Sequence, residues 1–236
     1  MLTFRQRVHA FRWAYRLITR RDYPTELDFI KTSLAADDVC FDIGAHSGTW
    51  SYPLSKIAGR TYAFEALPYY AEVLASTLSL LGVTNVTVIN KAASDREDTV
   101  GLVWRDSSGK RLTGFTHVAG ETETESQLKV SAVSLDSFVQ ENRIEKRIAF
   151  IKCDVEGYEC HVISGALQVI SRCRPLIFAE AKDGWFRRYA KSSKDLFNIL
   201  SSSGYVSKVF LPDGTLAEVT ATRYSGAGDI LFCPEA

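Results

Sequence analysis

Two short strand-like runs, one followed by a glycine loop and the other by an acid, constrain the fold of this chain most strongly. The first, residues 38–42, leads into a loop that contains Gly44 and Gly48. The second, residues 61–64, is followed by Glu65, which lies 21 residues after Gly44. Apolar runs of this length next to glycines predict buried strands, and the glycines let a ligand approach the backbone. The pair predicts the first strand–turn–helix–strand unit of a doubly wound α/β fold.

The acids beside these runs indicate the kind of ligand. Glu65, at the tip of the second strand, can accept hydrogen bonds from both hydroxyls of a ribose. A dinucleotide fold has the pattern G-x-G-x-x-G to hold a pyrophosphate, whereas Asp42 here opens an Asp-x-Gly-x-x-x-Gly loop. A carboxylate at the loop favours a cationic adenosine cofactor. S-adenosylmethionine (SAM), which carries a sulfonium, an ammonium and a ribose, fits this pattern of acids. The alternative is an ordinary strand–turn–helix unit without a ligand, in which the acid on the second strand occurs by chance.

The rest of the chain continues to alternate strands with helices. Further strands are predicted at 86–89, 148–153, 175–179, 205–210 and 229–232. Helices are predicted at 49–57, 69–81 and 192–203; another helix begins at residue 134, and a separate one, after the strand at 148–153, ends at residue 171. This alternation predicts one domain over residues 1–236, with a mostly parallel seven-stranded sheet and helices on both faces. Residues 96–133 are predicted to be an insertion with strands at 99–104 and 129–133. Its polar stretch 105–127 is expected to be an irregular, mobile loop or lid.

Acids are also predicted at the carboxyl ends of other strands, where a doubly wound sheet binds its ligand. The third strand is expected to contribute small residues, Ala92 and Ala93, which suit a flat adenine. A bound cation would relieve the charge of the acids. The acids at the strand ends are Asp42, Glu65, Asp154 and Glu180.

The run 154–157, Asp-Val-Glu-Gly, is the strongest candidate for a reacting centre. Lys152 and Asp154 alternate along the predicted strand and share one side of it. Asp154 can act as a general base for a hydroxyl, as a metal ligand, or as the acceptor for the cofactor ammonium. The alternative for Glu156 and Glu159 is the first turn of a helix, where acids favour the dipole and stay solvated.

Histidines and cysteines give little sign of a metal site. None of the four histidines has zinc-binding spacing, so no metal is expected, although a divalent ion is not excluded. His9 and His117 are expected at the surface and His161 inside a helix. His46 lies in the glycine loop, where it can reach a cofactor or acceptor or serve as polar packing. The five cysteines form no C-x-x-C pair, which favours a reducing cytoplasm.

Charge and hydropathy exclude other classes of protein. With 28 basic and 28 acidic residues, the chain lacks the basic excess of a nucleic-acid binder. No run reaches the ~18 apolar residues of a transmembrane helix. Residues 2–21 predict an amphipathic helix with a basic face; residues 1–35 form a helical extension. Such a helix docks on a membrane surface, or it caps its own domain or a partner, which we favour. Its apolar positions are Phe4, Val8, Phe11, Tyr15 and Ile18.

These motifs together resemble the FkbM family of SAM-dependent class I methyltransferases. The matching segments are Phe-Asp-Ile-Gly-Ala-His-Ser-Gly-Thr, Tyr-Ala-Phe-Glu-Ala, Asn-Lys-Ala-Ala-Ser-Asp, Ser-Leu-Asp-Ser-Phe and Ile-Lys-Cys-Asp-Val-Glu-Gly-Tyr-Glu, in the same order between residues 38 and 180. The resemblance implies O-methylation of a sugar, a polyketide or a similar small acceptor, with Asp154 and Glu156 at the reacting centre. At His46 the family commonly has asparagine. The cofactor residues expected are Asp42, Gly44, Ala45, His46, Gly48, Glu65, Ala66, Ala92, Ala93 and Asp154.

Two other functions fit part of the pattern. An NAD(P)-dependent oxidoreductase would share the fold, but the missing G-x-G-x-x-G pattern argues against it. A non-catalytic SAM-binding regulatory subunit would share the cofactor site, and the intact acids at four strand ends argue against that reading. The sequence does not identify the acceptor or the oligomeric state.

Overall fold

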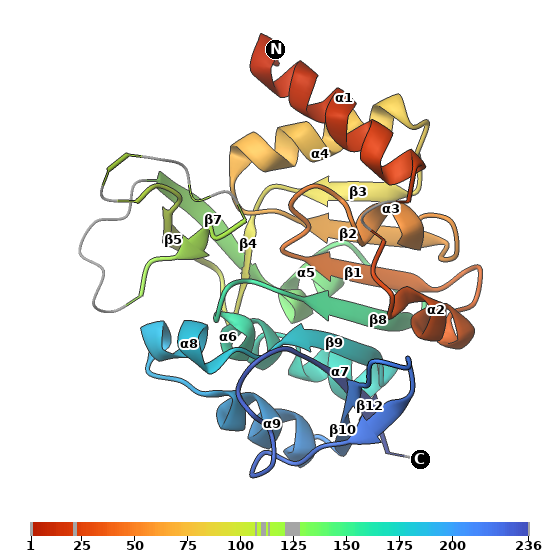
Figure 1. The fold of residues 1–236 in the computed structure, drawn as a ribbon, viewed down its shortest axis with the longest axis vertical. Coiled ribbons are helices and arrows are strands. Elements are labelled where there is room, and N and C mark those ends of the chain that lie inside the picture. Colours follow the sequence, from red (N-terminus) through yellow and green to blue (C-terminus); the bar gives the residue numbers. More distant parts are fainter. Residues whose placement is uncertain are drawn as a thin grey trace.

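The computed structural model describes residues 2–20, 23–106, 108–109, 112, 114–120 and 128–235. Figure 1 shows a large twisted sheet with helices on both sides and a smaller sheet beside its edge. The strands of the large sheet are β1 (Val39–Ile43), β2 (Arg60–Phe64), β3 (Val86–Ile89), β8 (Ile148–Cys153), β9 (Leu176–Glu180), β10 (Tyr205–Phe210), β11 (Leu216–Glu218) and β12 (Asp229–Pro234).

The large sheet has the order β11-β10-β12-β9-β8-β1-β2-β3. The five strands from β9 to β3 are parallel, and β12 is antiparallel to both of its neighbours. This arrangement confirms the predicted doubly wound, mostly parallel sheet. The eighth strand, β11, was not predicted; it forms a short antiparallel hairpin with β10 after the turn that contains Gly214.

The smaller sheet is built from residues between β3 and the next helix. Its strands are β4 (Ala92–Ser94), β5 (Asp98–Val103), β6 (His117–Val118) and β7 (Leu128–Ser134), in the order β4-β7-β5-β6. The two strands predicted within 96–133 correspond to β5 and β7. Ala92 and Ala93, expected at the end of the third strand, instead form β4. The irregular stretch expected at 105–127 contains β6, and residues 107, 110, 111, 113 and 121–127 lie outside the described residues.

Two predicted helices are shortened or divided in the structure, and α8 (Asp183–Phe186) was not predicted. Of the helix expected at 49–57 only Ser51–Leu54 is α-helical; turns follow it, and the side-chain amide of Asn85 donates to the carbonyls of Ser55 and Ala58 in these turns. The helix expected up to 171 is divided at Gly165, which packs so closely on β4 that a Cβ would lie 2.0 Å from the Ser94 oxygen. The α-helices are α1 (Phe4–Ile18), α2 (Leu27–Ile30), α3 (Ser51–Leu54), α4 (Pro68–Leu80), α5 (Leu135–Glu141), α6 (Glu159–Ser164), α7 (Leu167–Cys173), α8 (Asp183–Phe186) and α9 (Ser193–Ser202), with 3-10 turns at Lys31–Ser33 and Arg187–Tyr189.

The core lies on both faces of the large sheet because alternate strand residues point to opposite sides. Phe41 and Ile151 pack on one face against α5, α6, α7 and α9, whereas Cys40 and Phe150 pack on the other against α2 and α3. The buried sheet places the carboxyl ends of β1, β2 and β8 side by side at one edge, where the site lies.

The N-terminal helix α1 packs on α4 (Figure 1), through the side opposite its larger apolar side chains. The buried side chains of α1 are Gln6, Ala10, Ala14 and Leu17, and the five larger apolar side chains are exposed. The helix therefore packs on its own domain, as favoured from the sequence, and it does so through the side that carries the small side chains. Within the described ranges, no helix has the length and apolar character that crossing a membrane requires.

Candidate active site

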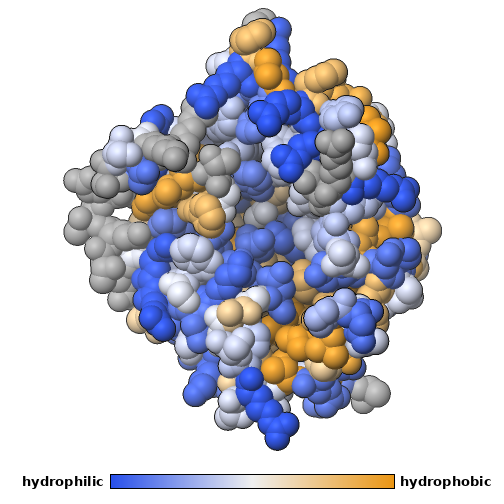
Figure 2. All heavy atoms as spheres, viewed as in Figure 1, coloured by the Kyte–Doolittle hydropathy of each residue, from blue (hydrophilic) through white to orange (hydrophobic). Residues whose placement is uncertain are grey.

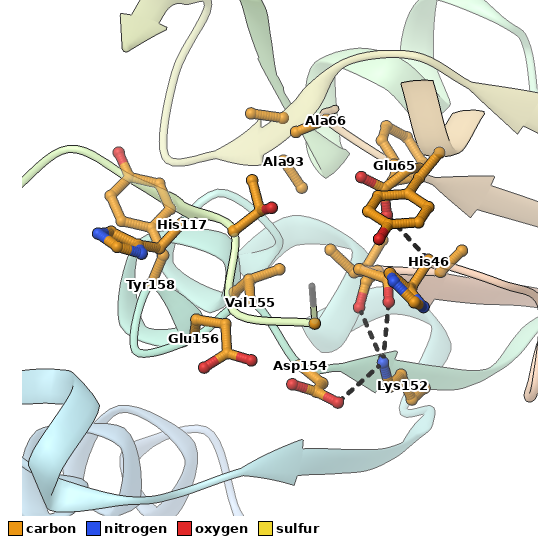
Figure 3. Close-up of a pocket in the computed structure, with 18 of the residues that line it drawn as sticks. His46, Glu65, Ala66, Ala93, His117, Lys152, Asp154, Val155, Glu156 and Tyr158 are labelled. Atoms are coloured by element: carbon orange, nitrogen blue, oxygen red, sulfur yellow. Dashed lines mark hydrogen bonds and ion pairs between the residues drawn. The ribbon is translucent and has the colours of Figure 1, made fainter. Parts of the chain in front are cut away.

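A cavity of about 360 Å³ lies over the carboxyl ends of β1, β2 and β8. Figure 3 shows Glu65 and Ala66 on one side of this cavity and Asp154 and Glu156 on another. The remaining walls come from β4, from residues 114–118 and from Trp13 of α1. Of the predicted cofactor residues, the cavity is lined by Gly44, Ala45, His46, Glu65, Ala66, Ala92, Ala93 and Asp154, and the structure does not bring Asp42 or Gly48 to its wall.

The glycine loop after β1 is shaped by close backbone packing. Gly44 has a φ of +78°, and a Cβ there would lie 1.9 Å from the backbone oxygen of Asp154. Gly48 has a φ of +87°, and a Cβ there would meet the side chain of Leu74 at 2.7 Å. The loop amides of Gly44 and Ala45 donate to the carbonyl of Phe64. The two glycines thus fix the loop against β8, β2 and α4, a role additional to the ligand approach inferred from the sequence.

Lys152 lies beneath this loop and links the two acids on either side of it. Its Nζ is 3.9 Å from Oδ1 of Asp42 and 3.3 Å from Oδ2 of Asp154, and it donates to the carbonyl of Gly44 at 3.2 Å. Burial raises the pKa of Asp42, an effect that Lys152 opposes. Asp42 is fully buried and also accepts from the hydroxyl of Ser51. Asp42 therefore holds Lys152 in place, whereas the sequence suggested that it faced the ligand.

Glu65 faces the cavity from the end of β2 and is held by two backbone amides. Its Oε2 accepts from the N–H of His46 at 2.8 Å and its Oε1 from the N–H of Leu67 at 2.9 Å. Burial raises the pKa of Glu65 to about 7, and these hydrogen bonds oppose the rise. Because each carboxylate oxygen can accept a second bond, both oxygens can still take hydroxyls from a ligand.

His46 occupies a left-handed backbone position, with a φ of +45°. Histidine is among the few side chains that adopt this conformation with any frequency. The ring lies 4.1 Å from the ring of Tyr70 and 6.1 Å from that of Trp13. Burial lowers the pKa of His46 to about 4, so the ring is neutral at pH 7. Its Nε2 is buried and has no hydrogen-bond partner in the described part of the chain.

Three carboxylates meet at the other side of the cavity. Oxygens of Asp154, Glu156 and Glu180 lie within 4.8 Å of one another. Lys152 pairs with Asp154, and Lys182 pairs with Glu180. Burial first, and then the charges of Glu180 and Asp154, raise the pKa of Glu156 to about 8. At pH 7 Glu156 is therefore mostly protonated, and each of the two other carboxylates has a lysine beside it.

The turn after β8 is built to project Glu156 into the cavity. Glu156 has a φ of +59°, and its Oε2 is buried without a hydrogen-bond partner among the described residues. The turn is held by Glu159, whose Oε1 accepts from the amides of Val155 at 2.8 Å and Gly157 at 3.4 Å. Glu159 does lie in the first turn of α6, but it is fully buried, so the alternative in which it stays solvated is wrong. Burial raises the pKa of Glu159 to about 8, which the amides oppose.

Several lining residues were missed by sequence reasoning. His117 was expected at the surface, but β6 buries it in the wall, where Nδ1 lies 2.9 Å from the carbonyl of Phe115. His9 was likewise expected at the surface and is half-buried against Tyr69. A polar loop has no periodicity that could have located His117. Trp13 could have been located from helical periodicity, because it lies three residues after Ala10 and on the same side of α1.

The fold and the site define a class. A parallel sheet that ends in an antiparallel pair, with an adenosine-type cavity over its carboxyl ends, is the architecture of a class I methyltransferase. Solved structures share it: a putative O-methyltransferase from Klebsiella pneumoniae (11% identity, TM-score 0.54, 97% of this chain and 90% of that chain) and SMU.1697c, a putative methyltransferase from Streptococcus mutans in complex with SAH (10% identity, TM-score 0.51, 87% and 93%). At such identities the likeness concerns the fold alone.

The sequence then identifies the family. Residues 42–207 match the sequence model described as the Methyltransferase FkbM domain, and the chain belongs to the FkbM methyltransferase family. The solved FkbM methyltransferase from Methylobacillus flagellatus KT is 16% identical, with a TM-score of 0.52 over 85% of this chain. This chain spans only 44% of the length of that one. No curated protein matches the chain. The family confirms the resemblance inferred from the motifs.

Proposed function

We propose that this chain transfers the methyl group of SAM to a hydroxyl oxygen of a small molecule such as a sugar or polyketide. The observation that carries the proposal is Glu156, a cavity carboxylate with a raised pKa and a buried oxygen available to a ligand. Methyl transfer to oxygen requires the hydroxyl to lose its proton, so a carboxylate poised near the working pH is the group the reaction needs.

The lining residues support a specific placement of the cofactor. Glu65 takes the ribose hydroxyls, and the small wall of Ala66, Ala92 and Ala93 accommodates the adenine. The methionine end then lies at the glycine loop, where Asp154 provides negative charge for the ammonium. A dinucleotide would need to place a pyrophosphate against this acid, and the cavity therefore favours SAM over NAD(P).

The cofactor supplies an electrophilic methyl group, and this chain's residues align and deprotonate its acceptor. Glu156 takes the hydroxyl proton, the oxygen lone pair forms the new O–CH₃ bond, and the C–S bond breaks to leave S-adenosylhomocysteine (SAH). The three reacting atoms must lie in line, so the rigid turn that holds Glu156 is part of the catalytic geometry. Asp154, already paired with Lys152, serves as a fixed anion beside it.

Cysteine chemistry supports a proposal for the location of the reaction. All five cysteines are free, and Cys40, Cys153 and Cys160 are buried. Free thiols are typical of a reducing compartment, which supports the cytoplasmic location expected from the sequence. A small-molecule acceptor rather than a nucleic acid is supported by the balanced charge of the chain.

The test is the chemical position of the transferred methyl. The protein is incubated with SAM that carries a ¹³C-labelled methyl and with a panel of sugars and polyketide alcohols, and the products are analysed by NMR. The expected product has the chemical shift of an O-methyl group. Label on nitrogen or carbon would overturn O-methylation. SAH binding without transfer to any acceptor would favour the non-catalytic regulatory subunit.

Substitution of Glu65 tests the cofactor placement. Glu65→Ala should weaken binding of SAM by about 1–3 kcal/mol, the cost of losing charge-assisted hydrogen bonds. The thermal midpoint should fall as well, because the amides of His46 and Leu67 lose their acceptor. Calorimetric titration measures the affinity, and Glu65→Gln, which retains one acceptor oxygen, should lose less. Wild-type affinity in Glu65→Ala would exclude Glu65 as the ribose ligand.

Chelation tests the expectation that no metal takes part. Lys152 and Lys182 already neutralise two of the three clustered carboxylates, and the third is mostly protonated. We expect EDTA to change the initial rate by less than about twofold, because no Lewis acid is needed when a base removes the proton. Initial rates with and without EDTA decide this point. Inhibition that Mg²⁺ or Mn²⁺ reverses would place a metal in the three-carboxylate cluster.

A further inference from the structure

The outer face of α1 carries most of the large apolar surface that the described residues expose. Nine large apolar side chains are exposed within the described ranges, and five of them lie on this one helix. Phe4 is 83% exposed, Phe11 69% and Ile18 62%. At 3.6 residues per turn the five fall on one side of the helix. We call them the apolar stripe: Phe4, Val8, Phe11, Tyr15 and Ile18.

The opposite side of α1 fixes the helix to the domain. Ala10 and Leu17 are buried against α4, the hydroxyl of Thr77 donates to the carbonyl of Ala10 at 3.4 Å, and Gln6 donates to Glu72. A capping box at Thr3 orders the first turn. The stripe therefore points away from the domain on a helix that is firmly held, and folding of this chain does not cover it.

Positive charge surrounds the stripe. The first 21 residues contain six arginines and no acid, so the remainder of the chain holds 22 basic against 28 acidic residues. On the helix Arg5 and Arg12 lie along one edge of the stripe and Arg7 along the other, and all three are exposed. Figure 2 shows blue side chains next to orange ones at the top of the molecule, where α1 lies.

We propose that α1 docks the protein on an anionic membrane surface, with the apolar stripe in the acyl boundary and the flanking arginines at the lipid phosphates. An apolar face bordered by arginines is the composition of helices that lie in the membrane interface, and each basic residue adds attraction to anionic lipid. The proposal does not depend on the reaction that the site catalyses.

A second copy of the chain fits this surface less well. In a symmetric dimer the same patch meets itself, and the exposed Arg5, Arg7 and Arg12 would then face their own copies, with no acid on α1 to pair with them. The remaining large exposed apolar side chains, Leu80, Phe115, Leu167 and Leu211, lie on separate elements and form no second stripe. Charge and apolar pattern together favour lipid.

Vesicle co-sedimentation of the whole chain tests the proposal. The protein should pellet with vesicles of equimolar phosphatidylcholine and phosphatidylglycerol, and much less with phosphatidylcholine alone. Phe4→Ser/Phe11→Ser/Ile18→Ser should reduce the partition coefficient by about tenfold or more, since each side chain transfers a large apolar area from water. Arg5→Glu/Arg12→Glu should remove the preference for anionic vesicles. The matched control Leu167→Ser/Leu211→Ser, which changes exposed apolar residues elsewhere, should pellet like wild type.

Because the changed side chains are exposed, each variant should remain folded. Circular dichroism and the thermal midpoint check this. The proposal is overturned if wild type does not pellet with anionic vesicles, or if the control variant loses binding as strongly as the stripe variant. It is also overturned if wild type forms a dimer in solution that the stripe substitutions dissociate while vesicle binding is absent. That result would assign the stripe to a second copy.

Discussion

Glu156→Gln should lower kcat by about a hundredfold or more, because it removes the group that takes the acceptor's proton while keeping the shape of the side chain. In wild type, kcat/KM should rise with pH and level off above about 8, since burial raises the pKa of Glu156 to about 8 and only the deprotonated form accepts a proton. The variant should lose this rise. Rates measured from pH 6 to 9.5 at several acceptor concentrations test both points.

Asp154→Asn is the matched comparison for this prediction. It removes the fixed anion beside Lys152, so SAM affinity should fall and saturating SAM should restore much of the rate. A Glu156→Gln enzyme with wild-type kcat and an unchanged pH profile would remove Glu156 from proton transfer. A hundredfold loss in Asp154→Asn that SAM cannot restore would assign that role to Asp154.

Gly44→Ala should abolish SAH binding and destabilise the fold by about 3 kcal/mol or more, since overpacking and a left-handed alanine both cost free energy. The new Cβ would lie 1.9 Å from the backbone oxygen of Asp154, and a backbone atom cannot rotate away. Separation of the glycine loop from the end of β8 would dismantle the floor of the cavity. Urea unfolding gives the stability, and calorimetry gives SAH affinity under conditions where the variant is folded.

Gly82→Ala is the control for backbone strain. Gly82 has a similar positive φ of +65°, but nothing lies within 4 Å of the position of its Cβ. This variant should lose only about 1 kcal/mol and bind SAH normally. If Gly44→Ala were no less stable than Gly82→Ala, the loop would not be packed on β8 as described.

The sequence predicted the parts of the fold that depend on local pattern. Strands β1, β2 and β8 are buried on both sides, so their apolar runs and the acids beside them could be recognised without the structure. The placement of Glu65 and Asp154 at one cavity followed from the rule that ligands bind at the carboxyl ends of strands. These two residues were therefore predictable as lining residues.

Other features depend on contacts between distant segments and had no local signal. Asp42 and Lys152 belong to neighbouring strands, and only their register shows that the acid is occupied by the lysine. His117 reaches the cavity because a strand of two residues is held by β5. The sequence pattern of α1 did not show which side faces the domain, because its larger apolar side chains are exposed and the side packed on α4 carries small side chains such as Ala10 and Ala14.

Calorimetric titration with SAH and, separately, with NAD⁺ tests the central claim most directly. The claim is that the cavity between Glu65 and Asp154 is a SAM site of a methyltransferase. We expect SAH to bind at one site per chain, with weaker binding in Glu65→Ala. NAD⁺ should give no binding heat, because in the proposed placement its pyrophosphate would lie against Asp154. Tight binding of NAD⁺ without binding of SAH would contradict the account.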